Sequence, residues 1–347
     1  MLTIGGREIY NGGCPYIIAE ISANHDGSYE RAVEIIHAAR EAGADAVKIQ
    51  TYTADSMTLD CDSEIFRIKG TIWNNLTLFE LYRKACTPLA WHPKLKKVAD
   101  ENGIDFFSTP FDCHGVDFLD ELSTPVFKVA SFELVDIPLL EKIASKGKPV
   151  IMSTGMATLA EIADAVRALR QNGCGDLALL KCVSSYPAIP EEMNLRTIPH
   201  LAESFHCATG ISDHSLDISV PVTAVALGAC IIEKHLTLSR NDGGPDATFS
   251  LEPNEFKAMV NAVRIAHQAL GKVSYEPTEG EEKSKALRRS LFVVKDVKSG
   301  EPLTHENVRS IRPGDGLSPK HLKDILGKTA VRDLKFGTPL GWHCISG

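Results

Sequence analysis

The chain has 347 residues, of which 44% are hydrophobic and 24% are charged, and its formal net charge at pH 7 is −8. This composition is typical of a globular protein, and the length predicts one large domain with a small appendage. The acidic balance argues against sequence-independent nucleic-acid binding, and no apolar run reaches the length of a membrane span. The N-terminal residues lack a leader-like pattern, and the nine scattered cysteines form no CxxC pair. We therefore expect a cytoplasmic protein with neither nucleic acid nor membrane as a partner.

Short apolar runs and helix-like segments alternate between residues 16 and 238. Ser28 offers an N-cap to a helix that Gly43 ends, and Thr158 with Glu161 forms a capping box at the start of another. Eight apolar runs are expected to be strands: 16–21, 46–50, 106–108, 126–130, 150–153, 177–182, 208–211 and 229–235. This alternation predicts an α/β fold, a TIM (β/α)8 barrel. The rival, an open doubly wound sheet, would normally show a glycine-rich fingerprint after its first strand, and this sequence has none.

Two parts of the chain depart from this alternation. Residues 53–88 are longer than an ordinary loop between strand and helix, and such long barrel loops commonly shape a substrate pocket. Residues 272–286 are polar and predict a linker. Beyond it, residues 294–303 resemble 331–340, which predicts two similar strand–turn–strand units. We expect a catalytic domain over 1–271, a linker over 272–286, and a small domain over 287–347 that docks on something larger because its core is thin.

Two histidines mark the ends of successive predicted strands. His214 follows Ser212 and Asp213, and His235 follows Glu233 and Lys234. The carboxyl ends of barrel strands carry the chemistry in this fold. Two neighbouring imidazoles suit a divalent metal that keeps positions open for water and substrate, and such a metal acts as a Lewis acid. The five histidines His25, His37, His92, His114 and His206 are expected in loops or on helix surfaces, with His25 nearest to the strand ends.

Further polar side chains recur at the predicted strand ends. The set comprises Glu20, Lys48, Thr109, Lys128, Ser131, Glu133, Ser153, Ser184, Tyr186 and Ser212. A single serine or threonine at a strand end is more often a helix N-cap than a ligand. A lysine within an apolar strand needs a buried partner and is rarely structural, which favours a functional role for Lys48 and Lys128. Two lysines with several hydroxyls would suit an anion that carries phosphate and carboxylate groups.

Several motifs, taken in order, resemble the sialic acid synthase family. They lie at residues 18–27, 47–51, 107–111, 127–131, 152–156, 210–214, 233–235 and 243–246, and the resemblance covers nearly the whole chain. The C-terminal region is similar to the antifreeze-like (SAF-type) domain of those synthases, including residues 312–316. Residues 66–70, Trp73 and residues 76–79 are most similar to the pseudaminic acid synthase branch. The N-acetylneuraminate branch usually has Asn where this chain has Ser184.

The resemblance implies a transferase that condenses phosphoenolpyruvate with an open-chain N-acetylated amino sugar. In the pseudaminic branch the acceptor is 2,4-diacetamido-2,4,6-trideoxy-L-altrose, and the products are pseudaminate and phosphate. The metal, Mn²⁺ or Mg²⁺, would be held by His214 and His235. The residues implied for substrate binding are Lys48, Thr109, Lys128, Ser131, Ser153, Ser184, Tyr186 and Ser212 for phosphoenolpyruvate, and Glu133 and Asp246 for the sugar.

The remaining implied roles concern single residues. Glu20 would orient or deprotonate a water molecule. Glu233 is expected as a sugar contact or a support for the metal site, although strand alternation is taken to point it away from His235. Arg312 matches the family arginine that reaches a partner subunit's active site, which implies a domain-swapped homodimer.

Three alternatives stay open at this level. The chain would serve as an N-acetylneuraminate or legionaminate synthase, or a spore-coat polysaccharide relative, if its pocket accepted N-acetylmannosamine or a related sugar. It would be a non-catalytic carbohydrate-binding protein that uses its small domain, with an inactive barrel, if it bound sugar without releasing phosphate. It would be an aldolase or hydrolase if a lysine formed a Schiff base, which borohydride would trap.

Overall fold

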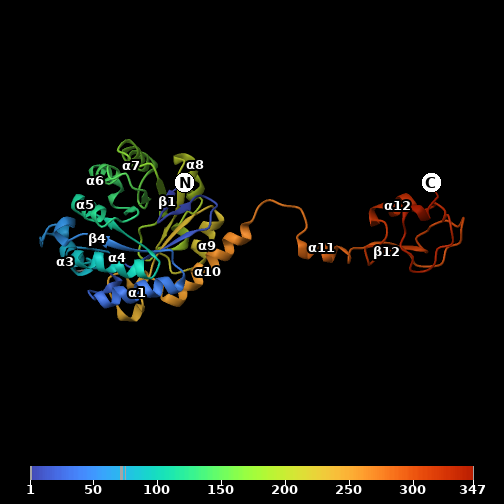
Figure 1. The fold of residues 1–347 in the computed structure, drawn as a ribbon, viewed down its shortest axis with the longest axis horizontal. Coiled ribbons are helices and arrows are strands. Elements are labelled where there is room, and N and C mark those ends of the chain that lie inside the picture. The colour runs from blue at the N-terminus through green and yellow to red at the C-terminus, as the bar shows by residue number, and fades with distance from the viewer. Residues whose placement is uncertain (1, 71–72, 75, 347) are drawn as a thin grey trace. The chain divides into compact units, whose positions relative to one another are not determined.

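The computed structural model describes residues 2–70, 73–74 and 76–346, and the fold is drawn in Figure 1. The chain divides into two compact units, Met1–Gly271 and Lys272–Gly347. Within the described residues, no helix combines the length and apolar character that crossing a membrane would require.

The first unit is built around a closed barrel of eight parallel strands, as the alternation predicts. Each strand is hydrogen-bonded to the next in chain order, and the last pairs with the first. The strands are β3 (Tyr16–Glu20), β4 (Ala46–Thr51), β5 (Asp105–Pro110), β6 (Phe127–Val129), β7 (Val150–Ser153), β8 (Leu177–Cys182), β9 (Ala208–Asp213) and β10 (Ile231–His235). The ring-closing register places His235 beside Glu20. Residues far apart in sequence therefore meet at the carboxyl ends of the strands.

Helices surround this barrel (Figure 1). They are α1 (Tyr29–Ala42), α4 (His92–Glu101), α5 (Cys113–Glu121), α6 (Ile137–Ala144), α7 (Leu159–Gln171), α8 (Thr197–Phe205), α9 (Ser219–Ala226) and α10 (Pro253–Leu270). Both helix-start signals act as expected. Ser28 Oγ accepts from Arg31 N at 3.1 Å, and Thr158 and Glu161 form the capping box. Gly43 ends α1 with φ +90°, a conformation that costs glycine little. The apolar faces of these helices pack against the outward side chains of the strands.

The amino end of the barrel is covered by a hairpin that the sequence patterns did not indicate. Its strands are β1 (Leu2–Ile4) and β2 (Arg7–Ile9), which pair antiparallel. Leu2, Ile4 and Ile9 are buried in one apolar cluster with Tyr16 and other residues from the strands. Three-residue strands are too short for a period-2 pattern to stand out, which explains why they were missed.

The insertion at residues 53–88 carries two helices, α2 (Ala54–Met57) and α3 (Leu78–Ala85). α3 begins at a capping box between Thr77 and Glu80 and places Phe79 and Leu81 inside. This insertion is therefore partly helical and has a buried face, instead of being an irregular loop.

The second unit contains α11 (Glu279–Lys285), β11 (Ser290–Val293), β12 (Val308–Ile311) and α12 (Leu322–Ile325). β11 and β12 pair antiparallel, and apolar side chains from both enter a small core. The two similar stretches, 294–303 and 331–340, pair with each other, because Val297 and Leu334 exchange backbone hydrogen bonds of 2.9 and 2.8 Å. The segment expected as a linker contains α11.

Candidate active site

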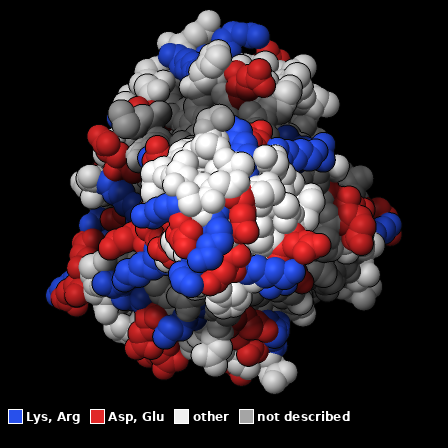
Figure 2. Space-filling view, turned by 90° about the vertical axis from the view of Figure 1, so that its right-hand side faces the viewer, with Lys and Arg blue, Asp and Glu red and all other residues white. Residues whose placement is uncertain are grey.

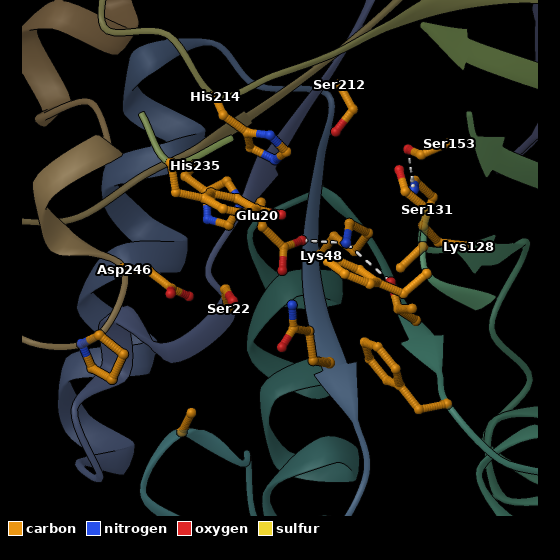
Figure 3. Close-up of a pocket in the computed structure, with 18 of the residues that line it drawn as sticks. Glu20, Ser22, Lys48, Lys128, Ser131, Ser153, Ser212, His214, His235 and Asp246 are labelled. Carbon is orange, nitrogen blue, oxygen red and sulfur yellow. Dashed lines mark hydrogen bonds and ion pairs between the residues drawn. The ribbon is translucent and has the colours of Figure 1, made fainter. Parts of the chain in front are cut away.

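A cavity of about 360 Å³ opens at the carboxyl ends of the barrel strands. Figure 3 shows charged and hydroxyl side chains from several strands pointing into it. The residues that the sequence singled out and that line the cavity are Glu20, Lys48, Thr109, Lys128, Ser131, Glu133, Ser153, Tyr186, Ser212, His214, Glu233, His235 and Asp246. The fold thus brings together thirteen side chains that are spread over more than two hundred residues of sequence.

Two expected site residues lie elsewhere. Ser184 is outside the set of described residues that line the cavity, and its hydroxyl lies 3.8 Å from the sulfur of Cys182, which does line it. Arg312 follows β12 in the second unit, where its side chain is exposed.

Two buried lysines and two buried carboxylates form the floor of the cavity. Lys48 Nζ lies 2.6 Å from Glu20 Oε2 and 3.7 Å from Glu233 Oε1, and it donates a hydrogen bond to Thr109 Oγ1 at 3.0 Å. Lys128 Nζ lies 3.8 Å from Glu233 Oε1. Each of the four side chains is at most 6% exposed. Both lysines therefore have the buried anionic partners that their place in the strands requires.

Burial separates the acidities of the carboxyl groups in this cavity. Burial raises the pKa of Glu20 to about 7, although Lys48 opposes the shift. Burial likewise raises the pKa of Glu133 to about 7. Burial would raise the pKa of Glu233 as well, but the nearby Lys128 and Lys48 outweigh it and lower this pKa below its ordinary value. One carboxylate thus stays ionised between two lysines, while two other carboxyl groups can exchange protons near neutral pH.

Hydroxyl groups surround the second lysine. Lys128 Nζ donates to Ser153 Oγ at 2.7 Å, and Gly155 N donates to Ser131 Oγ at 3.0 Å. A Cβ atom on Gly155 would lie 2.7 Å from Ser131 Oγ, so only glycine permits this close approach. A buried lysine bonded to the Ser153 hydroxyl, with the Ser131 hydroxyl on the lining of the same cavity, forms a cradle that suits a phosphate or carboxylate group.

The two histidines face each other across the cavity wall, with ring centroids 5.4 Å apart. His214 Nδ1 donates to the backbone oxygen of Val183 at 2.9 Å, which leaves its Nε2 as a free acceptor. His235 Nδ1 is buried and has no hydrogen-bond partner among the described residues. Two uncommitted ring nitrogens fit a divalent cation. The described residues contain no cluster of three or more His, Cys, Asp or Glu side chains that would hold a metal alone, so water and substrate would complete its coordination.

The structure corrects two expectations from the sequence. Glu233 and His235 are two positions apart on β10, so their side chains point to the same face, and both line the cavity. His25 and His92 are fully buried, not in surface positions. His25 Nε2 lies 3.1 Å from Thr87 Oγ1, so this ring joins the segment after β3 to the end of the insertion. His92 Nε2 lies 2.9 Å from Thr51 Oγ1, so this ring joins α4 to the end of β4.

Several cavity residues were missed at the sequence level. Gln50 lines the cavity two positions after Lys48, and strand alternation was the signal that would have found it. Most of the others are apolar or aromatic and come mainly from the insertion and the loops. Seven of them, called the apolar wall below, are Met57, Trp73, Leu81, Tyr82, Ala85, Phe111 and Phe132. Tyr52, which also lines the cavity, stacks edge-on against Tyr82 and Phe111 at 5.8 and 5.2 Å. No sequence period marks such a wall.

Comparisons with known proteins agree with this geometry. The NeuB family model matches residues 35–275, and the SAF domain model matches residues 288–346. A pseudaminic acid synthase of Campylobacter jejuni is 47% identical over 94% of this chain and 95% of its own, and one of Helicobacter pylori is 44% identical over 94% and 96%. The crystal structure of an N-acetylneuraminic acid synthetase from Leptospira borgpetersenii superposes with a TM-score of 0.73 at 33% identity, covering 82% of this chain and 94% of that one. The chain therefore belongs to the NeuB family and carries a C-terminal SAF domain.

Proposed function

We propose that this protein is a pseudaminic acid synthase. It condenses phosphoenolpyruvate with 2,4-diacetamido-2,4,6-trideoxy-L-altrose to give pseudaminate and phosphate. The observation that carries the proposal is one cavity that joins a lysine-and-hydroxyl cradle for an anion to a pair of free imidazole nitrogens. The identity of 44–47% to two pseudaminic acid synthases over most of the chain supports the same reading.

Phosphoenolpyruvate would occupy the floor of the cavity. Its phosphate and carboxylate would be neutralised by Lys48 and Lys128 and hydrogen-bonded by the surrounding hydroxyls; those proposed as contacts are Thr109, Ser131, Ser153, Tyr186 and Ser212, with Ser184 behind them. A buried anion needs such partners because its desolvation is costly.

The metal proposed for this site is Mn²⁺ or Mg²⁺, held by His214 and His235. When bound, it supplies Lewis-acid polarisation of the acceptor's aldehyde group. Two imidazoles with open positions admit several divalent ions, so the choice between them rests on the family resemblance.

The carbon chemistry then follows from the positions of the charged groups. The C3 carbon of phosphoenolpyruvate attacks the aldehyde carbon. The new C–C bond forms as the aldehyde C=O π bond breaks and its oxygen takes up a proton, and positive charge is left at C2. Water adds to C2, and Glu20 accepts its proton; a pKa of about 7 suits that task. Phosphate then leaves from C2 by C–O cleavage, while the C2 hydroxyl loses its proton and becomes the keto group of the product. Lys48 and Lys128 stabilise the charge on the departing phosphate.

The apolar wall supports the choice of acceptor. The sugar's aldehyde end belongs at the imidazoles, so its far end, with a C6 methyl and a 4-acetamido group, would reach the wall formed by Leu81, Tyr82 and Ala85. An apolar surface suits a methyl group better than the C6 hydroxyl of N-acetylmannosamine. Glu133 and Asp246 would bind the polar groups of the sugar, and Glu233 would support the floor or contact the sugar.

We further infer that two chains assemble as a domain-swapped homodimer in which Arg312 reaches the partner's acceptor site. Four apolar side chains near the cavity mouth, Phe132, Val135, Met156 and Leu159, are each more than half exposed. A patch of this kind suits the docking of a small domain. The division into a catalytic domain over 1–271, a linker over 272–286 and a small domain over 287–347 belongs to the same proposal.

A cytoplasmic location is also part of the proposal, and the nine cysteines, all free, suit a reducing compartment. On the face shown in Figure 2, basic and acidic side chains are interspersed. The substrates proposed are accordingly small anions and sugars, with no nucleic acid or membrane as partner.

Mass spectrometry of the products tests this function. The full-length protein is supplied with Mn²⁺, the altrose derivative and phosphoenolpyruvate labelled with ¹⁸O in the bond between C2 and the phosphate. We expect unlabelled pseudaminate and labelled phosphate, because C–O cleavage sends the bridging oxygen with phosphorus. Label retained in the sugar acid, or no product, would refute the proposal.

A further inference from the structure

A buried ion pair lies directly behind the two histidines. Lys234 and Asp213 are partners in the parallel register of β10 and β9, and each is 1% exposed. Lys234 sits between Glu233 and His235, whose side chains line the cavity, so alternation turns Lys234 to the outer face of the barrel. The pair therefore has no access to substrate, and the reaction proposed above assigns it no task.

The hydrogen bonds of this pair enclose His214. Lys234 Nζ donates to Asp213 Oδ2 at 2.5 Å, to the backbone oxygen of Ser215, and to Ser215 Oγ at 3.3 Å. Asp213 Oδ1 in turn accepts from Ser215 N at 2.9 Å. The residues before and after His214 are thus both fixed to one ammonium group, and all three of its donors are used.

The same ammonium is tied to the second histidine through the chain, because Lys234 immediately precedes His235. Movement of the His214 loop relative to the end of β10 would break several hydrogen bonds to a buried charge at once. A buried ion pair is weak evidence for stability, because its desolvation offsets its attraction, so a geometric role explains it better.

We propose that the Lys234–Asp213 pair is a positioning device that holds His214 and His235 in the relative arrangement that a divalent cation requires. Supporting partners of metal ligands typically change metal affinity by about 10- to 100-fold when removed. The inference rests on the metal site proposed above, and it assigns Lys234 and Asp213 a role in binding metal and none in contacting substrate.

Calorimetric titration of the metal-free full-length protein with Mn²⁺ tests this inference. Lys234→Met preserves the length of the side chain but removes its charge and donors. We expect Mn²⁺ to bind about 10- to 100-fold more weakly to this variant. If Lys234→Met does not fold, the paired change Lys234→Met with Asp213→Leu removes the unpaired charge, and the same weakening is expected.

Arg264→Met is the matched control. Arg264 NH2 lies 2.9 Å from Asp45 Oδ2 in another partly buried ion pair of the barrel, but this pair lies at the amino end of the strands, away from the histidines. We expect urea unfolding to show reduced stability in this control and unchanged Mn²⁺ affinity. Equal Mn²⁺ affinity in wild type and a folded Lys234 variant, or equal weakening in Arg264→Met, overturns the positioning role alone. Failure of the wild type to bind Mn²⁺ overturns the metal proposal and this inference together.

Discussion

The two ends of the barrel use buried polar groups in opposite ways. At the amino end, the Tyr16 hydroxyl donates a hydrogen bond to Asp105 at 2.6 Å. Asp45 forms ion pairs with Arg7 and Arg264 at 2.5 and 2.9 Å. At the carboxyl end, Glu20 Oε1, Glu133 Oε2, Glu233 Oε2 and His235 Nδ1 are buried without hydrogen-bond partners among the described residues. Polar atoms that lack partners inside a protein call for an explanation, and a ligand that supplies the partners is the simplest one.

This difference teaches which charges serve stability and which serve chemistry. The amino end is sealed by the β1–β2 hairpin and its ion pairs are complete, so it needs nothing from outside the chain. The carboxyl end keeps two lysines, four carboxyl groups and two imidazoles around an open cavity. Barrels of this type commonly divide stability and catalysis between their two ends in this way.

The largest effect is expected from His214→Ala or His235→Ala. Loss of one of only two imidazoles would remove metal binding, and turnover should fall by at least about a thousandfold. The circular dichroism spectrum should stay close to that of the wild type, because both rings lie at the cavity and outside the apolar clusters of the barrel. Near-normal turnover by a metal-depleted double variant would contradict the metal role.

Arg312→Ala should reduce kcat/KM for the acceptor by about 100-fold, because the variant loses a charged contact to the sugar. The KM for phosphoenolpyruvate should change little, because Arg312 is proposed to contact the acceptor only. Arg309→Ala, at an exposed position of β12 shortly before Arg312, is the control. Mixing the Arg312→Ala and His214→Ala proteins should restore activity at about a quarter of the sites if the small domain is swapped between subunits. No recovery in the mixture would contradict the swap.

Glu133→Gln should change how stability depends on pH. Burial raises the pKa of Glu133 from 4.5 to about 7, so ionising it costs stability as pH rises through that window. The variant has no such cost, and its free energy of unfolding should exceed that of the wild type by about 2 kcal/mol above pH 7 and by little below pH 4.5. Urea titrations across this range measure the difference. Glu121→Gln, at an exposed position of α5, should show no such dependence, and an equal change there would refute the assignment.

Leu81→Gln should weaken the preference for the 6-deoxy acceptor over its 6-hydroxy analogue. A polar group in the apolar wall would tolerate a C6 hydroxyl, so the ratio of kcat/KM for the altrose derivative over its 6-hydroxy analogue should fall by about tenfold. Lys84→Gln, on the exposed side of α3, should leave this ratio unchanged. A ratio that Leu81→Gln does not move would mean that the wall does not contact C6.

Arg264→Met should have the smallest effect and should confine it to stability. Removing a partly buried arginine from Asp45 should lower the free energy of unfolding by about 1 to 2 kcal/mol. Steady-state kinetics should be unchanged, because the pair lies at the sealed end. A marked loss of kcat would contradict the assignment of the amino end to stability and the carboxyl end to catalysis.

Much of the barrel was predictable because buried parallel strands are continuous apolar runs and helix starts carry caps. The site residues on strands were predictable for the same reason, since a lysine or histidine within an apolar run stands out, as Lys48 and His235 do. Gln50 was also predictable, because side chains alternate along a strand and Gln50 lies two positions after Lys48. The prediction that His25 and His92 are exposed was wrong, because burial by segments that are distant in the chain leaves no local pattern in the sequence.

The apolar wall and the Lys234–Asp213 pair depend on contacts between segments distant in the chain. Leu81 and Phe111 line the same cavity although they come from different segments, α3 and the loop after β5. In the sequence, Lys234 is one more polar residue beside His235. Only the register between β10 and β9 shows that it lies opposite Asp213. Periodicity describes one element at a time and therefore cannot report such meetings.

The most direct test of the proposed function is phosphate release from phosphoenolpyruvate with Mn²⁺, compared for the altrose derivative and N-acetylmannosamine. We expect phosphate release that depends on the altrose derivative and is much slower with N-acetylmannosamine. Release with N-acetylmannosamine alone would contradict the assigned acceptor and place the chain among neuraminate synthases with the same cavity chemistry. Release with neither sugar would contradict the proposed pseudaminate synthesis itself.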